Sequence, residues 1–202
     1  MERVIAYIDG YNLYYSLRDQ KWKWAYWLNI PALVQNVLTP NQTLLLTKYF
    51  TTRVSKPEDR RRRQLAYLEA LQTLPKLQIF YGQYVPDEVE CRKCGHTYTT
   101  YHEKMTDVNI AVEMMTDFLQ DSLDAALLLC GYSDLVGLVN RVRQLFKRRV
   151  IVLFPPARKP RTLRLAANST LDIDASLLAK SLLPEKITKS DGYILRRPVE
   201  WL

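Results

Sequence analysis

Short apolar runs alternate with segments of helical periodicity along most of this chain, and that alternation constrains its fold more than any other feature. The runs typical of buried strands are Val4–Ile8, Leu44–Phe50, Leu77–Tyr84, Ala125–Leu129 and Val150–Phe154. Helical patterns separate most of these runs. Strands joined through helices usually pair in parallel, because the chain must cross back before it can add the next strand. The sequence therefore predicts an α/β fold with a parallel sheet.

Helix boundaries are expected where capping residues and apolar stripes coincide. A helix is expected to begin at Pro31 with Asn29 at its cap, and another follows Ser55. The predicted apolar stripes are Tyr67, Leu71 and Leu74 in the second of these helices, and Val108, Val112, Met115 and Leu119 in a later one. Further helices are predicted at Asp134–Phe146, Thr162–Ala167 and Ala175–Leu183, with a sixth strand at Leu171–Ile173.

The chain of 202 residues is expected to form a single domain with two additions. One is a loop insertion at about residues 85–103, which shows no regular periodicity. The other is an extended tail at about residues 184–202. No apolar run approaches the roughly 18 residues that a membrane span needs. Because the first residues also lack a cleavable apolar segment, we expect a cytoplasmic protein that does not enter a membrane.

The balance of charge indicates an anionic partner. Lys and Arg number 29 against 21 Asp and Glu, so the formal net charge is +8. Nucleic acid is the leading candidate. A basic solvated face without a partner is the plain alternative, and it would make the chain an interaction module whose charge is incidental. Three Cys are too few for a disulfide scaffold.

Three acidic residues stand where the predicted strands and helices meet. Asp9 ends the first strand, Asp134 follows the strand Ala125–Leu129, and Asp107 begins the helix that leads into that strand. Ligands of open parallel sheets bind beyond the carboxyl ends of the strands, at the switch in strand order. If the first and fourth strands are neighbours, Asp9 and Asp134 face one crevice. Each acid alone could instead be an ordinary helix cap.

A carboxylate cluster in a basic protein suits the cleavage of a polyanion. Mg²⁺ and Mn²⁺ prefer oxygen ligands and retain several waters. Such ions activate water and stabilise charge on a phosphate. The pattern does not favour other enzyme classes: a haloacid dehalogenase-like phosphatase needs an acid where Tyr11 stands, and only Gly10 follows the first strand where a dinucleotide fold has a glycine-rich turn. No Ser/His/Asp arrangement is evident.

Three motifs in order resemble those of one family. They are IDGYN at residues 8–12, EKMTDVNIAVEMM at 103–115 and GYSDLVGLV at 131–139. Together they resemble the NYN domain of bacterial LabA-like type, a branch of the PIN-like metal-dependent nucleases, over about Val4 to Leu183. The segments SLLPEKI and RRPVEWL are also similar to bacterial members.

This resemblance implies a three-layer PIN-like fold, with a mainly parallel sheet flanked by helices, and Mg²⁺- or Mn²⁺-dependent cleavage of RNA. Asp9, Asp107 and Asp134 fall on the acidic positions of the family pattern, and Asn12 falls on its Asn. We expect Asn12 to position Asp9 or a bound phosphate, although it also reads as an ordinary residue at the start of a helix.

Tyr132 departs from the family pattern, which usually has two acids as Gly-Asp-Ser-Asp where this chain has Gly131-Tyr132-Ser133-Asp134. A phenol is neutral at pH 7 and is a poor ligand for Mg²⁺. Three accounts are open: a degenerate, non-hydrolytic RNA-binding or regulatory module; a substitution that relieved toxicity during cloning; or an enzyme for which Asp134 and a neighbouring acid suffice.

The insertion contains half of a zinc-binding pattern. Cys91 and Cys94 are separated by two residues and followed by Gly95, which suits a tight turn with both sulfurs on one ion. His96 and His102 would complete a Cys₂His₂ set. A pair of reduced thiols on a loop is the plain alternative, and a redox pair is a third.

Basic residues expected at the carboxyl edge of the sheet are candidates for contacts to the RNA backbone. They are Arg53, Arg60, Arg61, Lys104, Arg158, Arg161 and Arg164. The segment Lys21–Trp27 interleaves cations with aromatic rings on which unpaired bases could stack. Aromatic residues also serve in cores and in contacts between copies, so a homo-oligomer is compatible with this segment.

Overall fold

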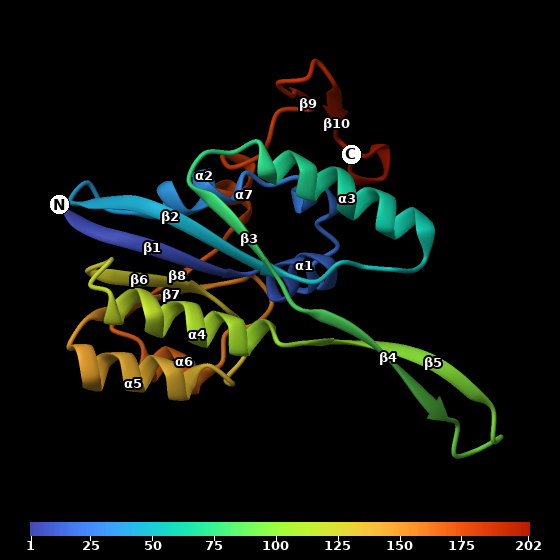
Figure 1. The fold of residues 1–202 in the computed structure, drawn as a ribbon, viewed down its shortest axis with the longest axis horizontal. Coiled ribbons are helices and arrows are strands. Elements are labelled where there is room, and N and C mark those ends of the chain that lie inside the picture. Colours follow the sequence, from blue (N-terminus) through green and yellow to red (C-terminus); the bar gives the residue numbers. More distant parts are fainter.

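The computed structural model describes residues 1–202 around a six-stranded sheet (Figure 1). Its strands, in spatial order, are β3 (Leu77–Tyr81), β2 (Gln42–Thr51), β1 (Glu2–Asp9), β6 (Ala125–Leu129), β7 (Arg149–Phe154) and β8 (Ser169–Asp172). Every neighbouring pair is parallel. The predicted α/β fold with a central parallel sheet is confirmed.

Helices cover both faces of this sheet, which gives three layers. One face carries α1 (Gly10–Asp19), α2 (Ile30–Gln35), α3 (Glu58–Gln72) and α7 (Ala175–Ala179), with the 3₁₀ turn η1 (Lys23–Tyr26). The other carries α4 (Thr106–Leu119), α5 (Val136–Phe146) and α6 (Arg161–Ala166). Because side chains alternate along a strand, Val4, Ala6 and Ile8 of β1 enter the first core, whereas Ile5 and Tyr7 enter the second.

Local sequence signals account for several boundaries. The Asn29 side chain accepts a hydrogen bond from the Ala32 amide at 3.0 Å and caps α2. Tyr67 and Leu71 of α3 are buried, as their helical spacing predicts. β6 has the predicted limits, and all five of its side chains are buried, as in a central parallel strand.

The predicted inner stripe of α4 is wrong. Val108, Val112 and Leu119 are exposed by 61%, 56% and 74%, whereas Ile110 and Met114 are buried. Two apolar stripes share this helix, and helical spacing alone cannot choose between them. The buried face also includes Asp117, because Lys48 of β2 reaches it with a Nζ–Oδ2 distance of 2.6 Å. Pairing with a cation therefore lets an acidic residue face the core.

Two segments expected to be irregular are ordered. The insertion at 85–103 is an antiparallel hairpin of β4 (Gln83–Glu90) and β5 (Thr97–Lys104), which projects away from the sheet (Figure 1). The expected extended tail contains a second hairpin, β9 (Lys186–Thr188) with β10 (Ile194–Arg196), and the 3₁₀ turn η2 (Val199–Trp201). Trp201 is only 8% exposed, because it packs against rings of the first core.

The helices are all too short or too polar for a bilayer crossing.

Asp124 pairs with both Arg3 and Arg148, and replacing it tests how much this cluster at the amino edge of the sheet contributes to stability. Its carboxylate accepts hydrogen bonds from the Arg3 side chain (Nη2–Oδ1, 2.9 Å) and backbone amide (2.8 Å), which lower its pKa to about 2. The unfolded-state pKa is near 4, so this stabilisation is complete above pH 4 and is lost as the pH falls toward 2. We expect Asp124→Asn to lower the free energy of unfolding by about 1 kcal/mol at pH 7, since solvent screens the pair. Urea unfolding should show the difference in unfolding free energy between the two proteins narrowing as the pH falls from 4 to 2. A difference that does not change with pH would contradict the assignment.

Candidate functional site

Asp9 ends β1, caps α1 and is only 2% exposed. Its Oδ1 accepts the Asn12 amide at 2.9 Å, and its Oδ2 accepts a short hydrogen bond from the Asn12 side chain. Asn12 Oδ1 in turn accepts the Gly131 amide at 3.3 Å. Asn12 thus ties the end of β1 to the loop after β6, which is possible because these strands are parallel neighbours. This geometry supports the expectation that Asn12 positions Asp9.

Asp107 and Asp134 lie at the same edge of the sheet. Asp107 is in the first turn of α4, and Asp134 stands in the turn before α5. Both are exposed and line one open groove between these helices. The chain therefore brings all three predicted acids to the carboxyl edge of the sheet. They lie at the switch in strand order, where β1 stands between β2 and β6.

Glu103 is a fourth acid of this region that the sequence analysis missed. It lies near the end of β5, and its Oε1 accepts the Thr106 amide at 3.1 Å at the start of α4. Its position four residues before Asp107 was the available signal. Because residues 85–103 were expected to form an irregular loop, the spacing gave no reason to place Glu103 beside Asp107.

The pKa values report the crowding of these carboxylates. Burial raises the pKa of Asp9 to about 7, against the lowering effect of the Asn12 hydrogen bonds, and the charges of Asp107 and Glu103 raise it further. The pKa of Asp107 is also raised, first because surrounding protein shields part of its carboxyl from water, although the residue as a whole is exposed, and then by the charges of Glu103 and Asp134. None of Asp9, Asp107 and Asp134 forms an ion pair with a Lys or Arg. The edge is therefore a pit of unneutralised negative charge.

The donor set fits a hard divalent cation in its chemistry. All four groups are carboxylates, the ligands that Mg²⁺ and Mn²⁺ prefer. No three His, Cys, Asp or Glu side chains stand close enough to hold one ion directly. Ligation partly through water matches this spacing, because Mg²⁺ usually retains several waters.

Tyr132 lies beside the pit and is exposed. The guanidinium of Arg158 stands 4.7 Å from the centre of its ring, within the range of a cation–π contact. Arg158 also pairs with Asp19, with an Nη2–Oδ2 distance of 3.0 Å. Gly131 is closely packed here, since a Cβ at that position would lie 2.8 Å from Arg158 Cβ. The phenol therefore occupies the loop next to Asp134 without being part of the core.

The structure separates the predicted basic residues by their partners. Arg53 stacks on the Tyr81 ring at 4.4 Å, Arg61 pairs with Glu58, and Arg164 pairs with Asp172. Three others make no ion pair and are exposed: Arg60, Lys104 and Arg161. Together with Arg53, these three are the members of the set that form no ion pair within the chain.

The four predicted zinc ligands are not gathered into one site. Cys91, Cys94 and His96 lie in the turn of the β4–β5 hairpin. His102 pairs across the ladder with Val85, five positions from the pair Glu90–Thr97 that precedes the turn. At about 3.3 Å per residue, this separation removes His102 from the turn. The zinc hypothesis assumed an irregular loop, and the paired strands overturn the Cys₂His₂ set.

The interleaved cations and rings of Lys21–Trp27 divide between core and surface. Trp27 is fully buried and donates from Nε1 to the Pro184 carbonyl at 2.9 Å, so it is not free to stack on a base. Lys23 and Tyr26 instead line a cavity that Gly10 also lines.

Comparison with known proteins agrees with this architecture. A protein-family model described as NYN domain matches residues 3–174. The chain is 25% identical to 6-hydroxy-3-succinoylpyridine 3-monooxygenase HspA of Pseudomonas putida (strain DSM 28022 / S16), an alignment covering 98% of this chain and 75% of the relative. The fold of this chain resembles the crystal structure of a protein of unknown function, VPA0982, from Vibrio parahaemolyticus RIMD 2210633. The TM-score is 0.60 and the identity 21%, covering 90% of this chain and 96% of the other.

Proposed function

The chain belongs to the NYN domain family, one of the PIN-like nuclease families, and on that premise we propose that it is a divalent-metal-dependent ribonuclease. One observation carries the proposal: an otherwise basic chain places Asp9, Asp107 and Asp134 at one edge of its sheet without a basic partner. A polyanion would be repelled by such a pit unless a cation also occupied it.

The residues have distinct proposed roles. Asp9, Asp107 and Asp134 hold Mg²⁺ or Mn²⁺ directly or through water, with Glu103 beside them. When bound, such an ion supplies activation of a water and stabilisation of charge on the phosphate. Asn12 orients the Asp9 carboxylate through the two hydrogen bonds that it donates.

The basic residues hold the strand. Lys104 and Arg161 are exposed and unpaired, and Arg158 borders the Gly131–Asp134 loop. We place these contacts, and the catalytic residues, in one domain formed by the whole chain.

The alternative is an RNA-binding or regulatory module of the same family that does not hydrolyse RNA. Tyr132 favours it, because a neutral phenol stands where the family pattern has an acid. Cleavage of a fluorescent single-stranded RNA with Mn²⁺, and its loss with EDTA, is the result expected of the nuclease. Salt-sensitive binding without cleavage would select the alternative. No binding at low salt would exclude both.

Replacing Tyr132 with Asp tests what the departure from the family pattern costs. Tyr132 is exposed, so the substitution removes no core packing, and it adds a hard oxygen ligand beside Asp134. We expect Tyr132→Asp to lower the Mn²⁺ concentration at half-maximal cleavage by about fivefold, since one added ligand contributes on the order of 1 kcal/mol. Tyr132→Asn is the control, because it also removes the ring but adds no charge. Equal Mn²⁺ titrations for both variants would contradict this role.

A second candidate function follows from the Pseudomonas relative, whose name describes a monooxygenase acting on a pyridine that carries a succinoyl group. The cavity beside Gly10 favours it, because its wall combines tyrosine rings with cations and so suits a small aromatic acid. Binding of pyridine carboxylates in preference to nucleotides would support this candidate.

A further inference from the structure

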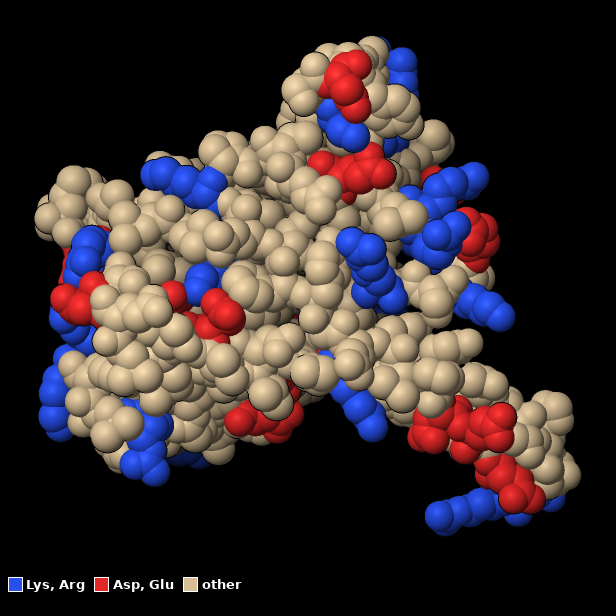
Figure 2. Space-filling view, viewed as in Figure 1, with Lys and Arg blue, Asp and Glu red and all other residues tan.

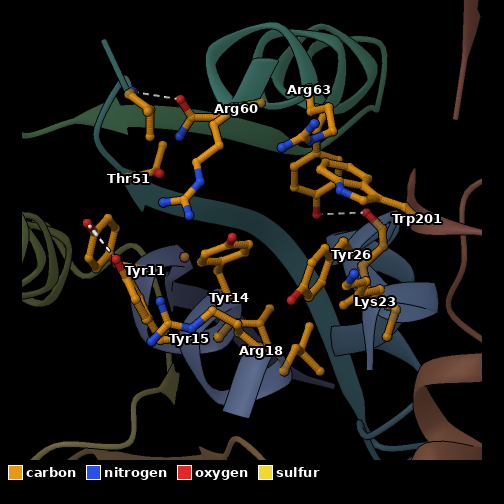
Figure 3. A pocket seen from close by; sticks show the side chains of 18 of the residues that line it. Tyr11, Tyr14, Tyr15, Arg18, Lys23, Tyr26, Thr51, Arg60, Arg63 and Trp201 are labelled. Carbon is orange, nitrogen blue, oxygen red and sulfur yellow. Dashed lines mark hydrogen bonds between the residues drawn. The ribbon is translucent and has the colours of Figure 1, made fainter. Parts of the chain in front are cut away.

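A cavity of about 490 Å³ lies next to the acidic edge and has no part in the roles proposed above for RNA cleavage. It lies between α1, η1, β2 and α3, and Trp201 and Glu200 of the C-terminal turn also line it (Figure 3). Its volume is in the range of small-molecule and cofactor sites. Gly10, which directly follows Asp9, forms part of its wall. The cavity therefore adjoins the proposed catalytic pit.

Tyrosine rings form much of the wall. Tyr11, Tyr14 and Tyr15 come from α1, Tyr26 comes from η1, and Tyr84 comes from β4. The ring centroids of Tyr14 and Tyr26 are 5.1 Å apart and tilted by 48°. Burial raises the pKa of Tyr26 to about 12, so its phenol is neutral at pH 7. Such rings offer planar apolar faces, together with hydroxyl groups that donate or accept hydrogen bonds.

Cations outnumber anions around the same cavity. The lining includes Arg18, Lys23, Lys56, Arg60 and Arg63, against the single acid Glu200. Glu200 is already paired with Arg63 at 3.1 Å, whereas Lys23, Lys56 and Arg60 form no ion pair. Figure 3 shows Arg60 extending from α3 toward the ring of Tyr14, and Figure 2 shows blue side chains gathered over the N-terminal half of α3. The cavity thus pairs aromatic faces with uncompensated positive charge.

Gly10 lets α1 begin close against β2 at the wall of the cavity. A Cβ at Gly10 would lie 2.4 Å from the Tyr49 ring and 2.8 Å from the Phe50 carbonyl oxygen, so only glycine lets the helix begin there. Tyr49 lines the cavity, and its pKa is raised first by burial and then by the charge of Asp9. The cavity and the proposed catalytic carboxylate of Asp9 are therefore adjacent, with Gly10 and Tyr49 between them.

We propose that this cavity binds one nucleotide of the RNA substrate, with its base against Tyr14 and Tyr26 and its phosphate at Arg60 and Lys56. The inference rests on the proposed function, because only an RNA substrate joins a nucleotide here to a scissile phosphate at the pit. A nucleotide combines a planar base with a phosphate, which match the aromatic rings and the unpaired cations of the cavity wall. An unpaired base stacks on aromatic side chains, and a phosphate accepts paired hydrogen bonds from a guanidinium.

The first test measures binding in EDTA, where cleavage does not occur. Quenching of tryptophan fluorescence, or calorimetry, is recorded with uridine and adenosine 5′-monophosphates, the two nucleosides, and inorganic phosphate. We expect the monophosphates to bind at least tenfold more tightly than nucleoside or phosphate alone. Arg60→Ala and Tyr14→Ala should each weaken this binding by about tenfold. Arg62→Ala is the matched control, since it removes the same charge from α3 at an exposed position outside the cavity.

The second arm separates a free nucleotide from one within RNA. Affinity for a single-stranded oligonucleotide should fall with Arg60→Ala by about the same factor. If only mononucleotide binding falls, the RNA assignment is overturned. Equal losses with Arg60→Ala and Arg62→Ala, or tighter binding of nicotinate than of the monophosphates, would overturn the nucleotide site. If the protein binds nucleotides but does not cleave RNA, the proposed nuclease activity is refuted and the nucleotide site is not. If Arg60→Ala and Tyr14→Ala leave RNA cleavage unchanged, the nucleotide site is refuted and the nuclease activity is not.

Discussion

Asp9→Asn is expected to reduce Mn²⁺-dependent RNA cleavage by about a thousandfold, because it removes the one buried carboxylate of the proposed metal site. Asn keeps an oxygen that can accept the Asn12 amide, so the cap of α1 is retained. The measurement is the initial rate of RNA cleavage at saturating Mn²⁺. A variant that retains more than about a tenth of native activity would remove Asp9 from the catalytic set.

Stability distinguishes loss of function from loss of fold in this experiment. Burying an ionised carboxylate among other acids costs free energy, so the urea midpoint of Asp9→Asn without metal should equal or exceed that of the native chain. Asp19→Asn is the control: it makes the same chemical change in α1, but at a partly exposed acid paired with Arg158. That variant should cleave RNA at nearly the native rate. A parallel loss in both variants would point to a general charge effect.

Lys48→Met is expected to lower the free energy of unfolding by about 3–5 kcal/mol. Lys48 is 5% exposed and reaches Glu113 at 2.7 Å and Asp117 at 2.6 Å from Nζ to the carboxylate oxygens. Tyr7 donates a hydrogen bond from its hydroxyl to Asp117 at 2.5 Å. Removing the cation leaves the Asp117 charge in the core with only this hydrogen bond. Chemical denaturation monitored by circular dichroism gives the value.

A double substitution tells charge from packing at this position. Lys48→Met with Asp117→Asn removes the cation and its main anion together, while an amide oxygen still accepts from Tyr7. We expect this pair to recover at least half of the loss. Lys180→Met, at an exposed residue without an ion pair, should change stability by less than about 0.5 kcal/mol. If the double variant is as unstable as Lys48→Met, the loss comes from packing and the ion-pair account fails.

The fold could be predicted well because its signals are local. Continuous apolar runs mark the buried strands, and Asn29 marks the start of α2. The prediction that residues 85–103 are irregular was wrong because this segment lacks such local signals. The side chains of that hairpin are mostly exposed, so no core imposes an apolar alternation by which its strands could be recognised. Trp201 was likewise unpredictable, since its burial depends on rings from distant segments.

The site was predictable only in part. Parallel strands end at a common edge, so Asp9 and Asp134 could be placed together from their positions in the chain. Glu103 depends on where a hairpin returns to the sheet, and the tyrosine cavity depends on the packing of α1 against α3. Neither relation leaves a periodic trace in the sequence.

By itself the sequence determined the alternation of buried strands and helices, the excess of positive charge, and the acids that follow two neighbouring strands. These are properties of residue type and order, which chain connectivity converts into a parallel sheet with one acidic edge. Only the tertiary structure decided which stripe of α4 is buried, that His102 lies apart from Cys91 and Cys94, and that unpaired cations share a cavity with tyrosine rings. Those outcomes depend on which distant side chains neutralise or cover one another, as Lys48 does for Asp117, and burial is settled only when such partners meet.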